Sequence, residues 1–281
     1  MAAIPRGNRR NAFYMLGGYA DREELGARLA RVYVSRVAAG DSITPFMRGL
    51  GAASLAFRGH FQEADGYLGE RDVLRVRPQL LMMGVRVDSA EPLVRRVLAE
   101  ALQPDARGAY AYIPWLAQRR DTAALAALLA SATARQRSTD QAVARFEHWA
   151  ANAVRAYAAL ARADTVAALG VLQSLPDSIC VLLCDELQLL EAQLLSSRGR
   201  FAAADTVLSY ERPGPAALPV TVLVYLERAR VAEHFQRRRD AIEWYSLVAD
   251  AWASGDASAR PFAAEASQGL RRLGGQSGES R

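Results

Sequence analysis

The chain has 281 residues, of which 51% are apolar, and a formal charge of +5. All 35 basic residues are arginine, so the sequence excludes every chemistry that needs a lysine, including phosphate-loop, Schiff-base and kinase chemistry. The positive charge is spread along the chain, which disfavours a nucleic-acid partner. No apolar run is long enough to cross a bilayer, so we expect no membrane insertion.

The N-terminal segment, residues 1–20, has early arginines but no apolar stretch of secretory length. We interpret it as a lead segment and expect a cytoplasmic protein. Abundant alanine and leucine favour helix throughout the chain, and a first helix is predicted over 21–39. The exclusive use of arginine, with only three asparagines, is typical of a GC-rich bacterial genome and needs no functional explanation.

Two stretches of the chain are nearly identical in pattern: AASLAFRGHFQEADGYL at 52–68 and AQLLSSRGRFAAADTVL at 192–208. They lie 140 residues apart, which is four times 35. A period of about 34 residues is typical of helical hairpins stacked into a solenoid. The spacing therefore predicts a repeat protein made of paired helices.

Each predicted hairpin follows one pattern. A small residue lies where the first helix crosses the second, a tight turn follows, and another small residue comes twelve positions after the first. In the first copy the small residues are Ala52 and Ala64, and Gly59 is predicted to take the left-handed conformation that ends a helix. The other pairs are Ala156 with Ala168, Ala192 with Ala204, and Ala229 with Ala241.

The turns of the later hairpins vary. Gly199 repeats the role of Gly59, whereas in the hairpin before it Asp164 or Thr165 is predicted to cap the second helix. The run Arg237–Arg239 replaces the glycine in the last hairpin. We interpret this run as a solvated corner, with an anion or phosphate contact as the alternative.

The region between Ala64 and Ala168 has room for two less regular units. Pro92 is predicted in the first turn of a second helix, and Pro114 should kink or shorten a first helix over 107–119. An aromatic cluster lies next to Pro114. We interpret it as side chains that fill an irregularity in the core, with a surface that binds a ligand as the alternative. The cluster consists of Tyr110, Tyr112 and Trp115.

No pattern of residues indicates a catalytic, cofactor or metal site. Cys180 and Cys184 would share one face of a helix, and we predict reduced core thiols in preference to a redox pair. The three histidines have no partner at a triad-like or metal-like spacing. They are His60, His148 and His234. We therefore expect a non-enzymatic protein without cofactors.

The C-terminal end predicts a closing helix over 259–273 and a disordered tail over 274–281. Short turn segments separate the units, and none is long enough to divide domains. The domain organisation is thus a lead segment, one helical repeat domain over 21–273, and the tail.

The hairpin pattern resembles the tetratricopeptide repeat, most closely at 192–208 and 225–252. In that motif, small residues at two crossing positions and large residues beside them let the helices approach, and here Ala229, Ala241, Tyr225 and Tyr245 occupy those places. The C-terminal half also resembles the repeat region that ends large bacterial signalling proteins of the serine/threonine kinase or regulator type. No kinase signature is present in this chain.

These observations predict an all-α protein: a right-handed solenoid of about six tetratricopeptide-like hairpins with capping helices at its ends. The resemblance implies a protein-interaction scaffold that binds a peptide or helix on its concave face, in bacterial signalling or complex assembly. The alternative is a structural subunit that stacks on its own copies into an oligomer or filament. We expect the concave face to expose Glu186, Leu189, Gln193, Leu226, Glu227, Arg230, Glu233 and His234.

Overall fold

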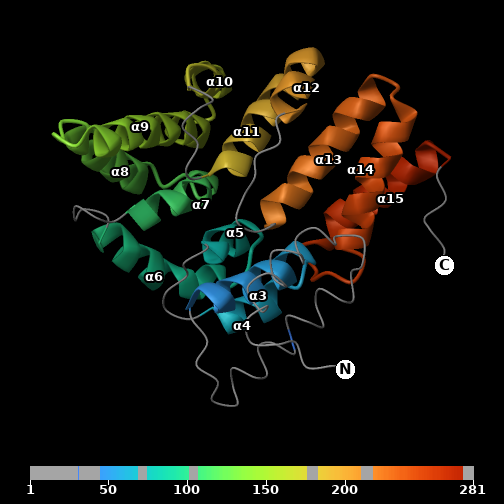
Figure 1. Ribbon diagram of the computed structural model, residues 1–281, viewed down its shortest axis with the longest axis horizontal. Coiled ribbons are helices and arrows are strands. Elements are labelled where there is room, and N and C mark those ends of the chain that lie inside the picture. The colour runs from blue at the N-terminus through green and yellow to red at the C-terminus, as the bar shows by residue number, and fades with distance from the viewer. Residues whose placement is uncertain are drawn as a thin grey trace. The chain divides into compact units, whose positions relative to one another are not determined.

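The structure is a computed structural model that describes Arg31 and residues 45–68, 75–100, 107–175, 183–209 and 218–274. These residues form helices and the turns between them, and no strand occurs among them (Figure 1). The expectation of an all-α protein is confirmed. The predicted helix over 21–39, the lead segment 1–20 and the tail beyond residue 274 lie outside the described residues, apart from Arg31.

The chain divides into two compact units, one made of residues 1–85 and 211–281 and the other of residues 86–210. The single repeat domain expected over 21–273 therefore contributes residues to both. The first unit takes its helices from two separate parts of the sequence. They are α3 (Pro45–Phe57), α4 (Phe61–Tyr67), α5 (Val76–Met82), α13 (Pro219–His234), α14 (Arg238–Ala251) and α15 (Arg260–Arg272).

The unit of residues 86–210 is continuous in sequence. It contains α6 (Val87–Glu100), the 3-10 helix η2 (Arg107–Tyr112), α7 (Ile113–Gln118), α8 (Thr122–Arg135), α9 (Gln141–Ala161), α10 (Thr165–Gln173), α11 (Cys184–Ser196) and α12 (Phe201–Ser209). Within it α9 packs against both α8 and α10, and α11 packs against α12. These contacts join helices that are neighbours in the sequence.

One turn geometry recurs through the described residues. A residue with positive φ ends the first helix, and the next backbone N–H donates to a carbonyl five residues back, which is the Schellman arrangement. Gly59 and Gly199 take this conformation as predicted, with φ of 78° and 71°. Gly84, Arg120, Ala163 and Gln236 occupy the same place in four further turns.

The predicted crossing residues are fully buried. Close helix approach requires a small side chain at the contact, and the alanines of the four predicted pairs are each 0% exposed. They are Ala52, Ala64, Ala156, Ala168, Ala192, Ala204, Ala229 and Ala241. The spacing of twelve residues therefore located the interior of these hairpins.

Two predictions about helix starts are confirmed, and a third is wrong. The Asp164 side chain accepts from the backbone N–H of Ala167 at 2.9 Å, so Asp164 is the cap of α10. Pro114 lies in the first turn of α7 and residues 107–112 are a 3-10 helix, which confirms the shortened first helix. Pro92, however, lies inside α6, because that helix begins at Val87. The prediction that Pro92 opens the helix is wrong.

In the unit that holds both ends of the described chain, the first hairpin packs against the last. The backbone N–H of Asp256 donates to the carbonyl of Gly59 at 2.9 Å, and the Asp256 carboxylate accepts from the N–H of Gln62 at 2.8 Å. A side chain at Gly59 would lie 3.0 Å from the Cα of Gly255. Asp256 thus caps α4, whose own N-cap residue, His60, makes no side-chain cap.

In a second long-range cap, a side chain from the early part of the chain caps a helix in the late part. Helix α13 begins at Pro219, and the side-chain oxygen of Gln79 in α5 accepts from the N–H of Val220 at 3.1 Å. Gln79 is only 4% exposed, so this bond forms in the core. A linear stack would bring together only neighbouring units. The packing order in this unit therefore differs from the nearest-neighbour order that we expected.

Candidate functional site: the ion-pair cluster along α13

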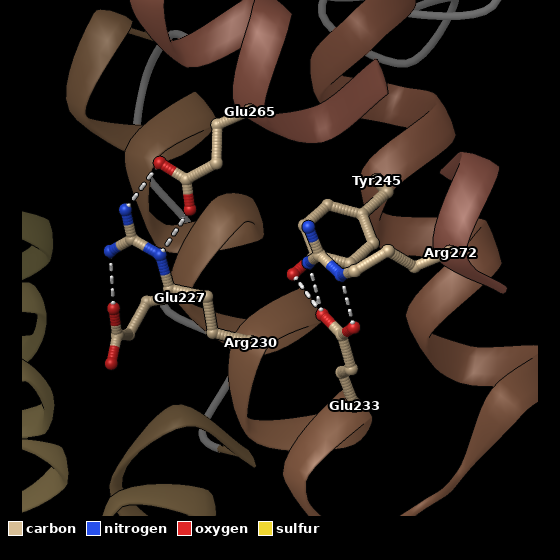
Figure 2. Close-up of polar contacts among 6 residues, drawn as sticks. All are labelled: Glu227, Arg230, Glu233, Tyr245, Glu265 and Arg272. Carbon is tan, nitrogen blue, oxygen red and sulfur yellow. Dashed lines mark hydrogen bonds and ion pairs between the residues drawn. The ribbon is translucent and has the colours of Figure 1, made fainter. Parts of the chain in front are cut away.

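Three of the predicted concave-face residues lie on one side of α13 because they are spaced three apart: Glu227, Arg230 and Glu233. Figure 2 shows that this side of α13 meets residues of α14 and α15. We call the six residues drawn there the α13 cluster. They are Glu227, Arg230, Glu233, Tyr245, Glu265 and Arg272.

Arg230 is the centre of one half of the cluster. Its Nε and Nη2 atoms donate to the two carboxylate oxygens of Glu265 at 2.7 and 2.8 Å, and its Nη1 donates to Glu227 at 2.9 Å. The hydrogen bonds to Glu265, together with the bond to Glu227, raise the pKa of Arg230, although burial of the side chain acts to lower it. A bidentate pair of this kind fixes orientation as well as distance.

Glu233 is the centre of the other half. Arg272 donates to both of its oxygens, at 2.9 and 2.8 Å, and the hydroxyl of Tyr245 donates to it at 2.6 Å. The bond from Arg272 lowers the pKa of Glu233. Burial, reinforced by the carboxylate of Glu233, raises the pKa of Tyr245. Each group is held in the protonation state that it has at neutral pH.

A glycine lets α15 approach closely enough to form these pairs. A Cβ atom added at Gly269 would lie 2.5 Å from the ring of Tyr245, so a larger residue there would displace the helix or the ring. Helix α15 has the predicted bounds, with Ala259 and Leu273 at its caps. The contact between Arg230 and Glu265 spans 35 residues, which is the repeat period read from the sequence.

Four of the eight predicted concave-face residues are buried. Leu226 is 1% and Glu227 2% exposed, while Leu189 is 6% and Glu186 9% exposed. Leu226 belongs to the apolar core, and the carboxylate of Glu227 is held by Arg230. The prediction that these positions are exposed is wrong. The leucine side chains are stabilised by burial, and a charged side chain can be buried when a partner of opposite sign accompanies it.

The remaining predicted positions differ among themselves. Gln193 and His234 are exposed. Arg230 and Glu233 keep 37% and 26% of their side-chain surface, but both form ion pairs with α15. Both charges are therefore paired within the fold. The α11 positions belong to the unit of residues 86–210, and the α13 positions belong to the other unit.

A second cluster, built from the same three residue types, lies in the unit of residues 86–210. Tyr110 donates to the carboxylate of Glu147, and Arg135 donates to the Tyr110 hydroxyl at 2.6 Å and pairs with Glu147 at 3.0 Å. Burial, with the neighbouring carboxylate, raises the pKa of Tyr110. This cluster could not be predicted from the sequence, because its members are separated by 25 and 37 residues and follow no motif.

The aromatic residues next to Pro114 form core. Tyr110, Tyr112 and Trp115 are 1%, 6% and 3% exposed, and Tyr110 packs against Phe146 with ring centroids 5.9 Å apart. The interpretation of this cluster as a filled irregularity is confirmed by its burial.

Cys184 is disulfide-bonded, which overturns the prediction of a reduced core thiol. Helix α11 begins at Cys184 because Leu183, before it, has the left-handed φ of 58°. Cys180, the other cysteine of the sequence, lies outside the described residues.

Within the described ranges, no group of three or more histidine, cysteine, aspartate or glutamate side chains could hold a metal ion. None of the helices that can be described is long and apolar enough to cross a membrane. Comparison with known proteins adds no family: no family model, curated protein or solved structure matches the chain.

Proposed function

We propose that this protein is a non-catalytic scaffold that binds another protein or peptide, in bacterial signalling or complex assembly. The observation that carries the proposal is the recurring hairpin, with its shared left-handed turn and fully buried crossing alanines. Repeated hairpins of this kind build extended surfaces for binding. The resemblance to tetratricopeptide repeats supports the same function and supplies the proposed partner class.

The chemistry of the two tyrosine–glutamate–arginine clusters favours a role in holding helices together. A general acid or base works best with a pKa near the working pH. In the α13 cluster the pKa of Glu233 is lowered and that of Tyr245 is raised, so both move away from neutrality. This is the opposite of the tuning that an acid–base enzyme needs.

Fewer of the predicted partner-binding positions are exposed than the sequence indicated. Of the predicted positions, Gln193 and His234 are the exposed ones, while the α13 cluster is occupied by contacts with α15. We therefore place the partner on exposed positions at the ends of the first helices and in the turns that follow them.

The disulfide also bears on the cellular compartment in which the protein works. The sequence led us to expect a cytoplasmic protein, but disulfides persist in oxidising compartments and are rare in the cytosol. The disulfide at Cys184 favours an oxidising compartment.

The test is capture followed by reconstitution. The purified chain is immobilised, proteins captured from an extract of the source cell are identified, and each is purified and mixed with the chain. Light scattering then gives the mass of the species in solution. We expect a stoichiometric complex of chain and partner. A chain that stays alone with every candidate would contradict the proposal, and a mass that rises with the concentration of the chain alone would favour self-assembly.

A further inference from the structure

The turn between α13 and α14 gathers positive charge and an exposed aromatic ring. Arg237, Arg238 and Arg239 are all exposed, and Phe235 is 41% exposed. Phe235 and Val166 are the two large apolar side chains with this degree of exposure among the described residues. We call His234, Phe235 and the three arginines the basic corner; in Figure 1 it joins the orange helices α13 and α14.

The arginines lie where they oppose helix stability. Arg237 is the N-cap of α14, and Arg238 and Arg239 are its first two residues, with Asp240 following. The N-terminus of a helix carries partial positive charge, so cations there are unfavourable. In α8, α9 and α10 the same position carries an acid, since Asp121, Asp140 and Asp164 cap these helices with side-chain hydrogen bonds.

The corner is ordered by its own contacts. The guanidinium of Arg237 lies over the Phe235 ring, 5.4 Å from its centroid, and the ring of His234 packs edge-on against Phe235 at 5.3 Å. Arg238 donates through Nε to the carbonyl of Leu273 at 2.8 Å, which joins the corner to the end of α15 and its exposed Arg271. Arg237, Phe235 and His234 thus lie in direct contact at the corner.

We propose that the basic corner binds an acidic peptide segment that carries an apolar side chain. This inference rests on the proposed function and names its partner class. Carboxylates would take charge-assisted hydrogen bonds from the arginines, and the apolar side chain would cover Phe235. Aromatic residues, phenylalanine among them, and arginine are enriched at protein interfaces. Charged residues that destabilise their own helix are typical of a functional site.

A peptide fits this patch better than a nucleic acid or a membrane. Nucleic-acid binding relies on a stripe of basic residues that follows the phosphate backbone, whereas the charge of this chain is spread and totals +5. Stable membrane attachment needs a larger apolar face than one ring provides.

The experiment uses the full chain and a short fluorescein-labelled peptide of alternating glutamate and leucine, followed by fluorescence anisotropy. The test variant replaces Arg237 and Arg239 with serine. The matched control replaces Arg198 and Arg200 with serine in the α11–α12 turn, where Arg200 precedes α12 as Arg237 precedes α14. Both variants lose two exposed charges.

We expect the test variant to bind the peptide about tenfold more weakly or worse, as loss of charge-assisted contacts implies, and the control to bind like the wild type. The melting temperature of the test variant should not fall, because serine is a preferred N-cap and two cations leave the helix N-terminus. Replacement of the glutamates by lysine should abolish binding of the peptide.

Equal affinity of the two variants would overturn the inference. So would tighter arginine-dependent binding of a single-stranded oligonucleotide or of phosphatidylserine vesicles than of the peptide. The two proposals can fail separately. If the wild type forms a complex with a captured partner but the basic corner plays no part in binding, the scaffold function stands and the proposed binding surface is contradicted. A wild type without any partner loses the scaffold function.

Discussion

The indole Nε1 of Trp252 donates a hydrogen bond of 3.0 Å to the backbone carbonyl of Phe57, 195 residues earlier in the chain. Trp252 is fully buried and also packs against Phe61 and Phe262, with ring centroids 5.8 and 5.4 Å away. One side chain therefore joins the first described hairpin to the last. The two ends of the described sequence stabilise each other.

Replacement of Trp252 by phenylalanine should lower the free energy of unfolding. The change leaves the buried carbonyl of Phe57 without its donor, which costs about 1 to 3 kcal/mol. Chemical denaturation measures the loss. The matched control is Trp244→Phe, since Trp244 is partly exposed and stacks on Tyr225. A control that loses as much stability as Trp252→Phe would contradict a special role for this bond.

Charge reversal at Arg230 should destabilise the fold. Arg230→Glu places a third carboxylate beside Glu227 and Glu265. We expect a loss of about 1 to 3 kcal/mol, less than for a fully buried pair because Arg230 keeps 37% of its side-chain surface and solvent screens it. Combining Arg230→Glu with Glu265→Arg should restore part of the loss. An Arg230→Glu variant as stable as the wild type would show that α15 is not held by this pair.

Overpacking a helix crossing should also destabilise the fold. Ala204 is 0% exposed, so Ala204→Leu should cost about 1 to 3 kcal/mol. Ala202, two residues earlier on the same helix, is exposed, and Ala202→Leu should change stability by less than about 0.5 kcal/mol. Thermal denaturation of the two variants compares them directly. Equal melting temperatures would remove the crossing assignment on α12.

The features that could be predicted from the sequence are the local and the periodic ones. The spacing of twelve residues found the buried alanines, and Gly59 and Gly199 took the left-handed conformation that their place in the pattern requires. The contact of Trp252 with Phe57 could not be predicted, since a pairing between distant segments leaves no period in the sequence. Glu227 was misplaced because a charged residue on a helix face reads as exposed unless its partner is known.

Alkaline pH should expose the role of the buried tyrosines. Burial is the largest cause that raises the pKa of Tyr110, Tyr157 and Tyr245 above the ordinary value of about 10. A group with a raised pKa contributes stability that is fully present below its unfolded pKa and is lost as the pH rises through its folded pKa. We therefore expect stability to fall above about pH 10.

The ultraviolet absorbance of tyrosinate follows this titration. We expect these three tyrosines to ionise only as the protein unfolds, so part of the absorbance should rise together with the loss of helical circular dichroism. Tyr245→Phe should reduce the amplitude of that late phase. Complete tyrosine ionisation while the helical signal persists would contradict the burial of all three.

The packing of the first described hairpin against the last is tested most directly by a distance between the two. Gln62 and Ala257 are both exposed, and the backbone N–H of Gln62 is bonded to Asp256 at 2.8 Å. Nitroxide labels on cysteines introduced at these two positions, with both native cysteines replaced by serine, allow electron–electron double resonance to measure their separation. Packing of α4 against the α14–α15 turn predicts a single distance at the short limit of the method, within one molecule. A long or broad distance distribution, as for a linear stack with separated ends, would contradict it.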